Sequence, residues 1–134
     1  MAVKWSKKYE TGMRDIDQQH HDLIDILNKF LFALQAGETG KPVIEIMDFL
    51  EKYVYDHFRT EEAYQIKYKY PEYQKHKTIH ETFKVKLKNV KSQLLNHPDE
   101  LKIAVRIQRE LISWLIDHIQ TQDKQLGQFL KNIN

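Results

Sequence analysis

The chain has 134 residues, 41% of them hydrophobic, and its 21 basic and 19 acidic side chains give a formal net charge of +2. This length suits one domain with a substantial core, so we expect a single domain over residues 1–134. The lack of Cys excludes disulfides, zinc–thiolate sites, iron–sulfur clusters and thiol catalysis. Charges of both signs are spread along the chain, which argues against a nucleic-acid partner.

Helices are the expected secondary structure, because only four Gly and three Pro occur among many Lys, Glu, Gln, Leu and Ile residues. No apolar run is long enough to span a bilayer, and the segment before Gly12 does not resemble a signal peptide. We therefore expect, by default, a cytoplasmic protein without a membrane span.

An N-terminal arm of some fifteen residues precedes the first predicted helix, and we interpret its Trp5 and Tyr9 as packing anchors. The first helix is predicted from about Asp17 to Ala36, with Gly37 as the stop signal. Its apolar stripe repeats every three or four residues and comprises Ile16, His20, Leu23, Leu27, Phe30 and Leu34.

The second helix is predicted from Pro42, which suits a helix start, to about Tyr68. Its stripe comprises Ile46, Leu50, Tyr53, His57 and Glu61. The third helix is predicted to open at Pro71 and to stop near Asn96-His97-Pro98. Its stripe comprises Tyr73, His76, His80, Phe83, Leu87, Val90 and Leu94.

The fourth helix has Asp99 as its predicted cap. Its stripe comprises Leu101, Val105, Gln108, Leu111, Leu115 and His118. Short connections between helices of similar length favour antiparallel packing. The predicted fold is therefore an all-α, up-down-up-down four-helix bundle with an N-terminal arm.

Five of the seven histidines fall on these stripes, at positions that otherwise hold Leu, Ile, Val or Phe. They are His20, His57, His76, His80 and His118. Burying an imidazole without a partner is costly. One such histidine is more often a satisfied core residue than a ligand, but five on four helices predict a metal site on the bundle axis. We expect His21 and His97 to face solvent.

The spacing of the polar residues supports a metal site. His76 and His80 are four residues apart, as are His57 and Glu61, so each pair projects from successive turns of one helix face. Asp123 follows His118 by five residues, which turns it away by about 140° on a regular helix. Taken alone, Asp123 is better explained as a surface acid. Asp123 can face the site only if the helix ends or distorts after His118.

Seven candidate ligands are too many for one tetrahedral zinc and suit two metals that share bridging carboxylates. Imidazole and carboxylate ligands without sulfur suit iron or manganese, although the order of affinities alone does not select iron over zinc. Two divalent ions bring four positive charges, of which two carboxylates and a bridging hydroxide leave one uncompensated.

Motifs along almost the whole chain resemble the hemerythrin family, and specifically its single-domain bacterial members. They are Ile16-Asp17-Gln18-Gln19-His20, His57-Phe58-Arg59-Thr60-Glu61-Glu62, His76 with His80 and Phe83, and Trp114 through His118-Ile119 to Asp123-Lys124. Trp5 and Gly12 also resemble the N-terminal arm of the family. Each motif taken alone is a weak indication of the family, whereas the combination of motifs is specific for it.

The resemblance implies two irons joined by a bridging oxo or hydroxo group. His76, His80 and His118 are then expected on one iron, and His20 and His57 on the other, with Glu61 and Asp123 bridging. It further implies that the second iron keeps an open position, where dioxygen binds reversibly and is held as a hydroperoxide. The residues expected to wall this oxygen pocket are Leu23, Phe58, Trp114, Leu115 and Ile119.

We therefore expect a dioxygen-binding protein, not an enzyme, that acts as a monomer in carriage, storage or delivery. A ferritin-like di-iron oxidase is the enzymatic alternative, but that class uses four carboxylates and Glu-x-x-His motifs. No Glu precedes any His by three residues in this chain. Oxygen or redox sensing is the other alternative, in which a partner protein reads the oxygenated state.

Overall fold

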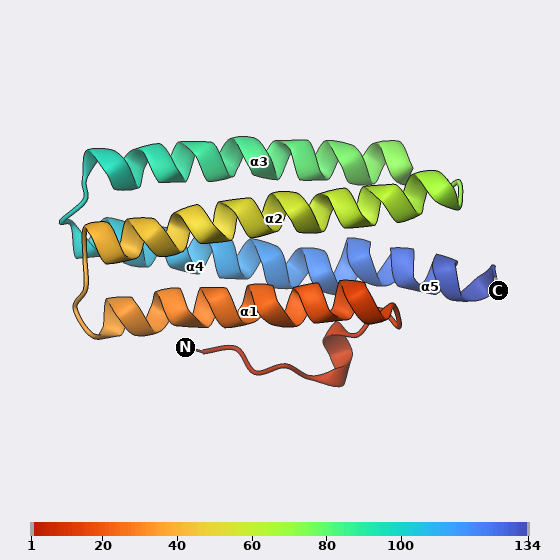
Figure 1. Cartoon of the computed structure of the whole chain (residues 1–134), viewed down its shortest axis with the longest axis horizontal. Helices are drawn as coiled ribbons and strands as arrows, with labels where there is room; N and C mark the ends of the chain where they lie inside the picture. Colours follow the sequence, from red (N-terminus) through yellow and green to blue (C-terminus); the bar gives the residue numbers. More distant parts are fainter. Residues whose placement is uncertain (1, 134) are drawn as a thin grey trace.

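Figure 1 shows the computed structural model of the chain, in which residues 2–133 are described. Four long helices pack side by side: α1 (Arg14–Gln35), α2 (Lys41–Lys67), α3 (Tyr73–Asn96) and α4 (Leu101–His118). The last continues through a five-residue π-helical turn, η2 (Ile119–Asp123), into α5 (Lys124–Asn132). Successive helices run in opposite directions, and residues 2–133 contain no strand. The predicted up-down-up-down bundle is confirmed.

The N-terminal arm lies along α1 and contains a 3-10 turn, η1 (Lys7–Tyr9). Val3 N–H donates to Asn28 Oδ1 at 2.9 Å, and Asn28 Nδ2 donates to the Val3 carbonyl at 2.8 Å. Tyr9 is buried and Trp5 packs half-buried against the core, as expected of packing anchors. The arm is shorter than predicted, because α1 begins at Arg14.

The far end of the arm is fixed beside the start of α1 and α5. The Asp17 carboxylate accepts hydrogen bonds from the Thr11 N–H at 2.7 Å and from the Thr11 hydroxyl at 2.8 Å. Gly127 of α5 lies against the Thr11 backbone so closely that a Cβ there would clash with the Thr11 carbonyl. This contact explains why a glycine stands inside α5.

Gly37 ends α1 as predicted. Its φ of +78° lets the Glu38 N–H donate to the Ala33 carbonyl at 3.0 Å, which satisfies a carbonyl of the last helical turn. Lys69 has the same role after α2, with a φ of +55°, and the next N–H, that of Tyr70, donates to the Gln65 carbonyl at 2.9 Å.

All four predicted helix starts differ from the structure: α1 starts three residues earlier than predicted, α2 starts one residue earlier, at Lys41, and α3 and α4 start later. The third helix begins at Tyr73 and not at Pro71, because the Tyr73 N–H donates to the Tyr70 carbonyl and places Pro71 in the connecting turn. The residue that caps α4 is Glu100 and not Asp99, and its side chain pairs with His97 and makes no capping hydrogen bond to the helix.

The buried faces of α1 and α3 agree with the predicted stripes, except that Tyr73 is half-buried. In α2 the predicted stripe lies to one side of the buried face, so Ile46 and Tyr53 are only half-buried. In α4, Val105 is half-buried and Leu101 is exposed. Each of these helices packs against two neighbours, which buries a broader face than one line of apolar residues. The additional buried residues are Val43, Met47, Val54, Phe58, Gln65, Ala104 and Ile107.

Two apolar clusters divide the interior. The large one fills most of the bundle and includes Leu23, Phe83 and Leu115. The small one consists of Ile16, Tyr70, Leu126 and Leu130, at the end where α5 and the α2–α3 connection lie. On each helix, the stripe histidines and Glu61 lie between residues of the large cluster and the end of the bundle that holds the small cluster. None of the helices described over residues 2–133 is both long and apolar enough to cross a membrane.

Candidate metal centre

The seven side chains that the sequence predicts as metal ligands meet in the bundle interior. They are His20 of α1, His57 and Glu61 of α2, His76 and His80 of α3, His118 of α4 and Asp123 at the end of η2. None is more than 2% exposed. All four bundle helices therefore contribute to one buried polar cluster.

The donor atoms form two groups, and within each group they lie within 4.8 Å of one another. The three-histidine group contains His76, His80 and His118 with Glu61 and Asp123. The two-histidine group contains His20 and His57 with the same two carboxylates. Two neighbouring donor sets that share two carboxylates suit a pair of metal ions better than one ion.

The π-helical turn brings Asp123 to the cluster. Its i→i+5 hydrogen bonds place one additional residue in the turn, so Asp123 returns to the face that His118 occupies. The Thr121 hydroxyl donates to the Asp117 carbonyl at 2.8 Å and so satisfies a carbonyl beside the widened turn. The structure thus shows the helix distortion that the five-residue spacing requires.

The two oxygens of Asp123 face different groups. Oδ1 lies 3.0 Å from both His76 Nε2 and His118 Nε2. Oδ2 lies 2.7 Å from His20 Nε2 and 3.8 Å from His57 Nε2. A carboxylate in this position can bind one ion through each oxygen.

The spacing of the imidazole nitrogens fits a metal ion. His118 Nε2 lies 3.1 Å from His76 Nε2 and 3.2 Å from His80 Nε2. Nitrogens bound at about 2.1 Å from one ion, at angles of roughly 90° to 110°, are about 3.0 to 3.4 Å apart. The inward edges of these rings therefore already have the separation of ligands on one ion.

Several polar atoms of the cluster make no hydrogen bond to any of residues 2–133. They are both oxygens of Glu61, His57 Nε2, Asp123 Oδ1, and the Nδ1 atoms of His20 and His118. Buried polar atoms without partners are unfavourable. The Glu61 oxygens, His57 Nε2 and Asp123 Oδ1 all point into the cluster, where a cation would satisfy them. The donor set therefore fits a metal.

Three histidines are held from behind by polar side chains. His57 Nδ1 lies 2.7 Å from Gln19 Oε1, and His76 Nδ1 lies 2.7 Å from the amide of Gln65. His80 Nδ1 lies 2.9 Å from Glu62 Oε2. These contacts direct each Nε2 inward, which is the usual arrangement around a metal-binding histidine.

Sequence reasoning missed two of these partners, Gln19 and Gln65. A signal existed for Gln65, because it follows Glu61 by four residues on the same buried face. No comparable signal existed for Gln19, because a half-buried amide next to His20 resembles an ordinary surface residue. Glu62, the last residue of the motif that begins at His57, pairs with His80.

Burial favours the neutral form of the His57 and His80 imidazoles. It lowers the pKa of His57 to about 3, with the nearby His20 adding to the shift. It also lowers the pKa of His80 to about 4, although the hydrogen bond to Glu62 opposes the change. Neutral imidazole is the form that binds metal, so the folded chain presents these two rings ready for ligation.

The two shared carboxylates differ in their ionisation. Burial and the neighbouring charge of Asp123 raise the pKa of Glu61 well above its usual value. Burial also opposes ionisation of Asp123, but its contacts with His118, His20 and His57 outweigh this and hold its pKa well below the usual value. Two carboxylates in one buried site resist a second negative charge, and a divalent cation would relieve that repulsion.

Aromatic rings cover the three-histidine group. Phe58 stacks on His80 with ring centroids 3.7 Å apart, and Trp114 stacks on His118 at 4.7 Å. Of the five residues predicted to wall an oxygen pocket, Leu23, Phe58, Leu115 and Ile119 are buried and Trp114 is half-buried. The structure thus places Phe58 and Trp114 against the three-histidine group, while the pocket itself stays a prediction.

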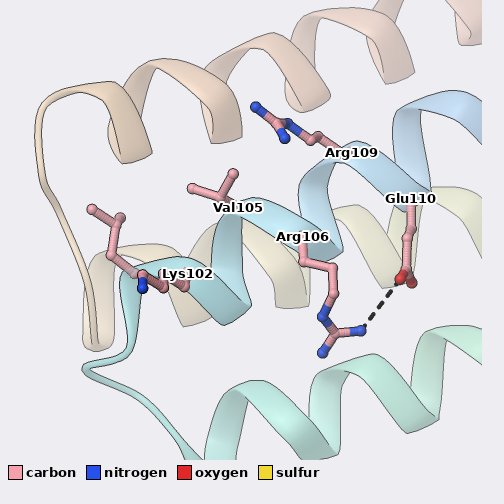
Figure 2. Close-up of a pocket in the computed structure, with 6 residues that line it drawn as sticks. Lys102, Val105, Arg106, Arg109 and Glu110 are labelled. Carbon is pink, nitrogen blue, oxygen red and sulfur yellow. Dashed lines mark hydrogen bonds and ion pairs between the residues drawn. The ribbon is translucent and has the colours of Figure 1, made fainter.

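Two surface hollows lie away from the cluster, whereas a small one near the α2–α3 connection is lined in part by His76. Figure 2 shows one of about 450 Å³ on the outer face of α4, where Lys102, Val105 and Arg109 are exposed or half-buried and Arg106 pairs with Glu110. A second hollow of about 540 Å³ lies between α1 and α2 and is lined by Ile26, Pro42 and Phe49, among others. Neither of these two hollows is lined by any of the seven cluster residues.

The two remaining histidines lie outside the cluster, as expected. The His21 side chain is 46% exposed and lies 3.4 Å from Asp25, and the His97 side chain is 49% exposed. The positions of all seven histidines thus match the division between buried and solvent-facing residues that the sequence predicts.

Comparison with known proteins gives relatives of one kind. The profile of the hemerythrin HHE cation binding domain matches residues 11–130. A bacteriohemerythrin of Stenotrophomonas maltophilia is 31% identical over 120 residues, which are 90% of this chain and 76% of that protein. One of Aquifex aeolicus is 25% identical over 130 residues, 97% of this chain and 98% of that protein.

The fold comparison agrees. A crystal structure of wild-type hemerythrin superposes with a TM-score of 0.80 at 23% identity, covering 95% of this chain and 96% of that one. The helix order, the buried cluster and the family profile all lead to the same assignment. The chain belongs to the hemerythrin family.

Proposed function

We propose that this chain binds two iron ions in the buried cluster and uses them to bind dioxygen reversibly, for carriage, storage or delivery. The observation that supports the proposal most directly is the pair of donor groups that share Glu61 and Asp123. The bacteriohemerythrin relatives and the sulfur-free donors support iron as the metal.

The seven residues take distinct roles in this proposal. His76, His80 and His118 hold one ion, and His20 and His57 hold the other, with Glu61 and Asp123 bridging. The protein then offers five donor residues to the first ion and four to the second. With a further oxo or hydroxo bridge, the second ion would keep a free position, and dioxygen would bind on the two-histidine side.

The iron pair supplies the electrons that reversible dioxygen binding requires. The protein supplies fixed ligands and a dry surrounding. Leu23, Leu115 and Ile119, each at most 2% exposed, exclude water from the cluster. Phe58 and Trp114 hold the rings of His80 and His118 in place by stacking.

The donor set argues for binding rather than oxidation. Five neutral imidazoles and two carboxylates stabilise high-valent iron less well than the carboxylate-rich set of ferritin-like oxidases. We therefore propose that the protein returns dioxygen unchanged and does not catalyse a reaction with it.

Metal analysis combined with oxygen uptake tests this function. Protein reconstituted with ferrous iron should contain two irons and take up one dioxygen per chain, and an oxygen electrode should record the same amount released when the gas phase is exchanged. His97→Gln, which alters an exposed histidine outside the cluster, serves as the control and should match the parent. A single zinc per chain that iron cannot replace would overturn the proposal.

A further inference from the structure

The five histidines of the cluster differ in what lies behind them. His57 and His76 meet the neutral amides of Gln19 and Gln65. The Nδ1 atoms of His20 and His118 form no hydrogen bond with any described residue. Among the described contacts, only the Nδ1 of His80 meets a carboxylate, with Glu62 Oε2 at 2.9 Å.

A carboxylate determines the direction of this hydrogen bond. An amide can donate or accept, so the contact of His76 with Gln65 permits either ring tautomer. Ionised Glu62 can only accept, so Nδ1 of His80 must donate and carry the proton. The Nε2 atom is then left with a free lone pair, 3.2 Å from both His118 Nε2 and Glu61 Oε1.

The surroundings of Glu62 keep this contact in place. The Glu62 side chain is 17% exposed, whereas that of His80 is fully buried. Lys84 and Lys77 are the nearby positive charges that favour the ionised carboxylate, and Glu61 is the nearby acid. The stacked ring of Phe58, tilted by only 6° from that of His80, prevents the imidazole from turning away.

We propose that Glu62 is a positioning residue that fixes the Nδ1–H tautomer of His80 and strengthens metal binding by the three-histidine group. Its negative charge makes the imidazole a more basic ligand. The two-histidine group has an amide behind one ring and no partner behind the other, so the two metals are held with unequal strength. This inference rests on the proposed metal binding of the cluster and extends it to a residue outside the ligand set.

The tautomer is measurable without metal. Side-chain ¹⁵N chemical shifts of His80 in the metal-free protein should report a protonated Nδ1 and a bare Nε2. Glu62→Ala should produce a mixture of tautomers, and so should Glu62→Gln, because an amide can accept from or donate to Nδ1. Glu81→Gln is the matched control, because Glu81 follows His80 in the chain, pairs with Lys84 and is 55% exposed. Parent-like shifts in Glu62→Ala would overturn the assignment.

Metal affinity separates this inference from the proposed function. Cobalt(II) titration of the metal-free protein against a competing chelator should show two ions per chain, and Glu62→Ala should bind one of them about 10- to 100-fold more weakly. Glu62→Gln should lose less, and Glu81→Gln should lose nothing. Two ions bound with parent affinity in Glu62→Ala would contradict the role of Glu62 alone. Failure of the parent protein to bind cobalt would contradict the metal centre itself.

Discussion

His118 and Asp123 face the same buried cluster although five residues separate them, with His118 Nε2 3.0 Å from Asp123 Oδ1. A regular helix would turn Asp123 away by about 140°. The π-helical turn Ile119–Asp123 absorbs the additional residue and returns the carboxylate to the inward face. The geometry of the centre therefore depends on a local backbone irregularity as much as on residue identity.

Shortening this turn by one residue should preserve metal binding, whereas lengthening it by one residue should not. Deleting Thr121 should restore a regular helix in which four residues separate His118 from the aspartate, so both still face inward and two metals bind. Inserting one alanine after Gln120 should rotate the aspartate by about 100° and abolish binding of at least one metal. The metal content per chain distinguishes the deletion variant from the insertion variant, and circular dichroism checks that both are folded. Equal metal content in both variants would contradict the role of the turn.

The two histidine groups should lose metal independently. His80→Gln removes a ligand of the three-histidine group, and His57→Gln removes one of the two-histidine group. Each variant should retain one strongly bound ion, and both should lose reversible dioxygen binding, because the reaction requires electrons from both irons. Cobalt titration and oxygen uptake measure the two effects. Parent affinity for two ions in both variants would show that the groups are not two sites.

The buried His57 and His80 should make the metal-free protein less stable as the pH is lowered. The folded-state pKa values of His57, about 3, and of His80, about 4, lie below the ordinary 6.5. Below pH 6.5 the unfolded chain therefore binds protons that the folded chain does not, and the lost stability approaches about 1.4 kcal/mol per pH unit for each histidine. Urea unfolding at pH 7, 6 and 5 measures the trend.

A matched variant assigns the pH effect. His57→Gln should reduce the loss of unfolding free energy between pH 6.5 and pH 5, where ordinary carboxylates still contribute little. Iron-loaded protein should unfold at a higher urea concentration than metal-free protein at every pH, because only the folded cluster binds the metal. An equal loss of unfolding free energy in His57→Gln and in the parent protein between pH 6.5 and pH 5 would contradict the predicted burial of a neutral His57, whereas the raised pKa of Glu61 acts in the opposite direction in both proteins.

Leu115 should control the lifetime of the oxygenated state. Leu115→Ala opens a cavity beside the cluster, costs about 2 to 5 kcal/mol of stability, and should admit water and speed irreversible oxidation of the irons. Leu94→Ala is the control, because Leu94 is equally buried but lies about 21 Å from His80 along α3. It should lose similar stability without faster oxidation. Equal oxidation rates in the two variants would show that side-chain exclusion of water does not set this lifetime.

The bundle and the positions of six of the seven donors could be predicted because helical periodicity determines which residues share a face, whereas Asp123 was predicted only from the resemblance to the hemerythrin family. Polar residues such as His20 and His118 on an apolar face then stand out. The faces of α2 and α4 were less predictable, since Ile46 and Val105 are as apolar as their buried neighbours and only packing decides which are covered.

The partners behind the histidines could not be predicted from periodicity. The contacts of Gln19 with His57, and of Glu62 with His80, join residues on different helices. They depend on helix rotation and on side-chain rotamers, neither of which local sequence specifies. The helix start at Tyr73 was missed for a related reason, because Pro71 is equally compatible with a turn.

Reversible dioxygen binding at a pair of irons is tested most directly by an optical spectrum recorded through one gas cycle. The ferrous protein should gain charge-transfer absorption in the visible range when air is admitted, lose it when the solution is degassed, and repeat the change in further cycles with two irons per chain throughout. A spectrum that does not change with air, or one that changes once and is not restored by degassing, would contradict reversible binding.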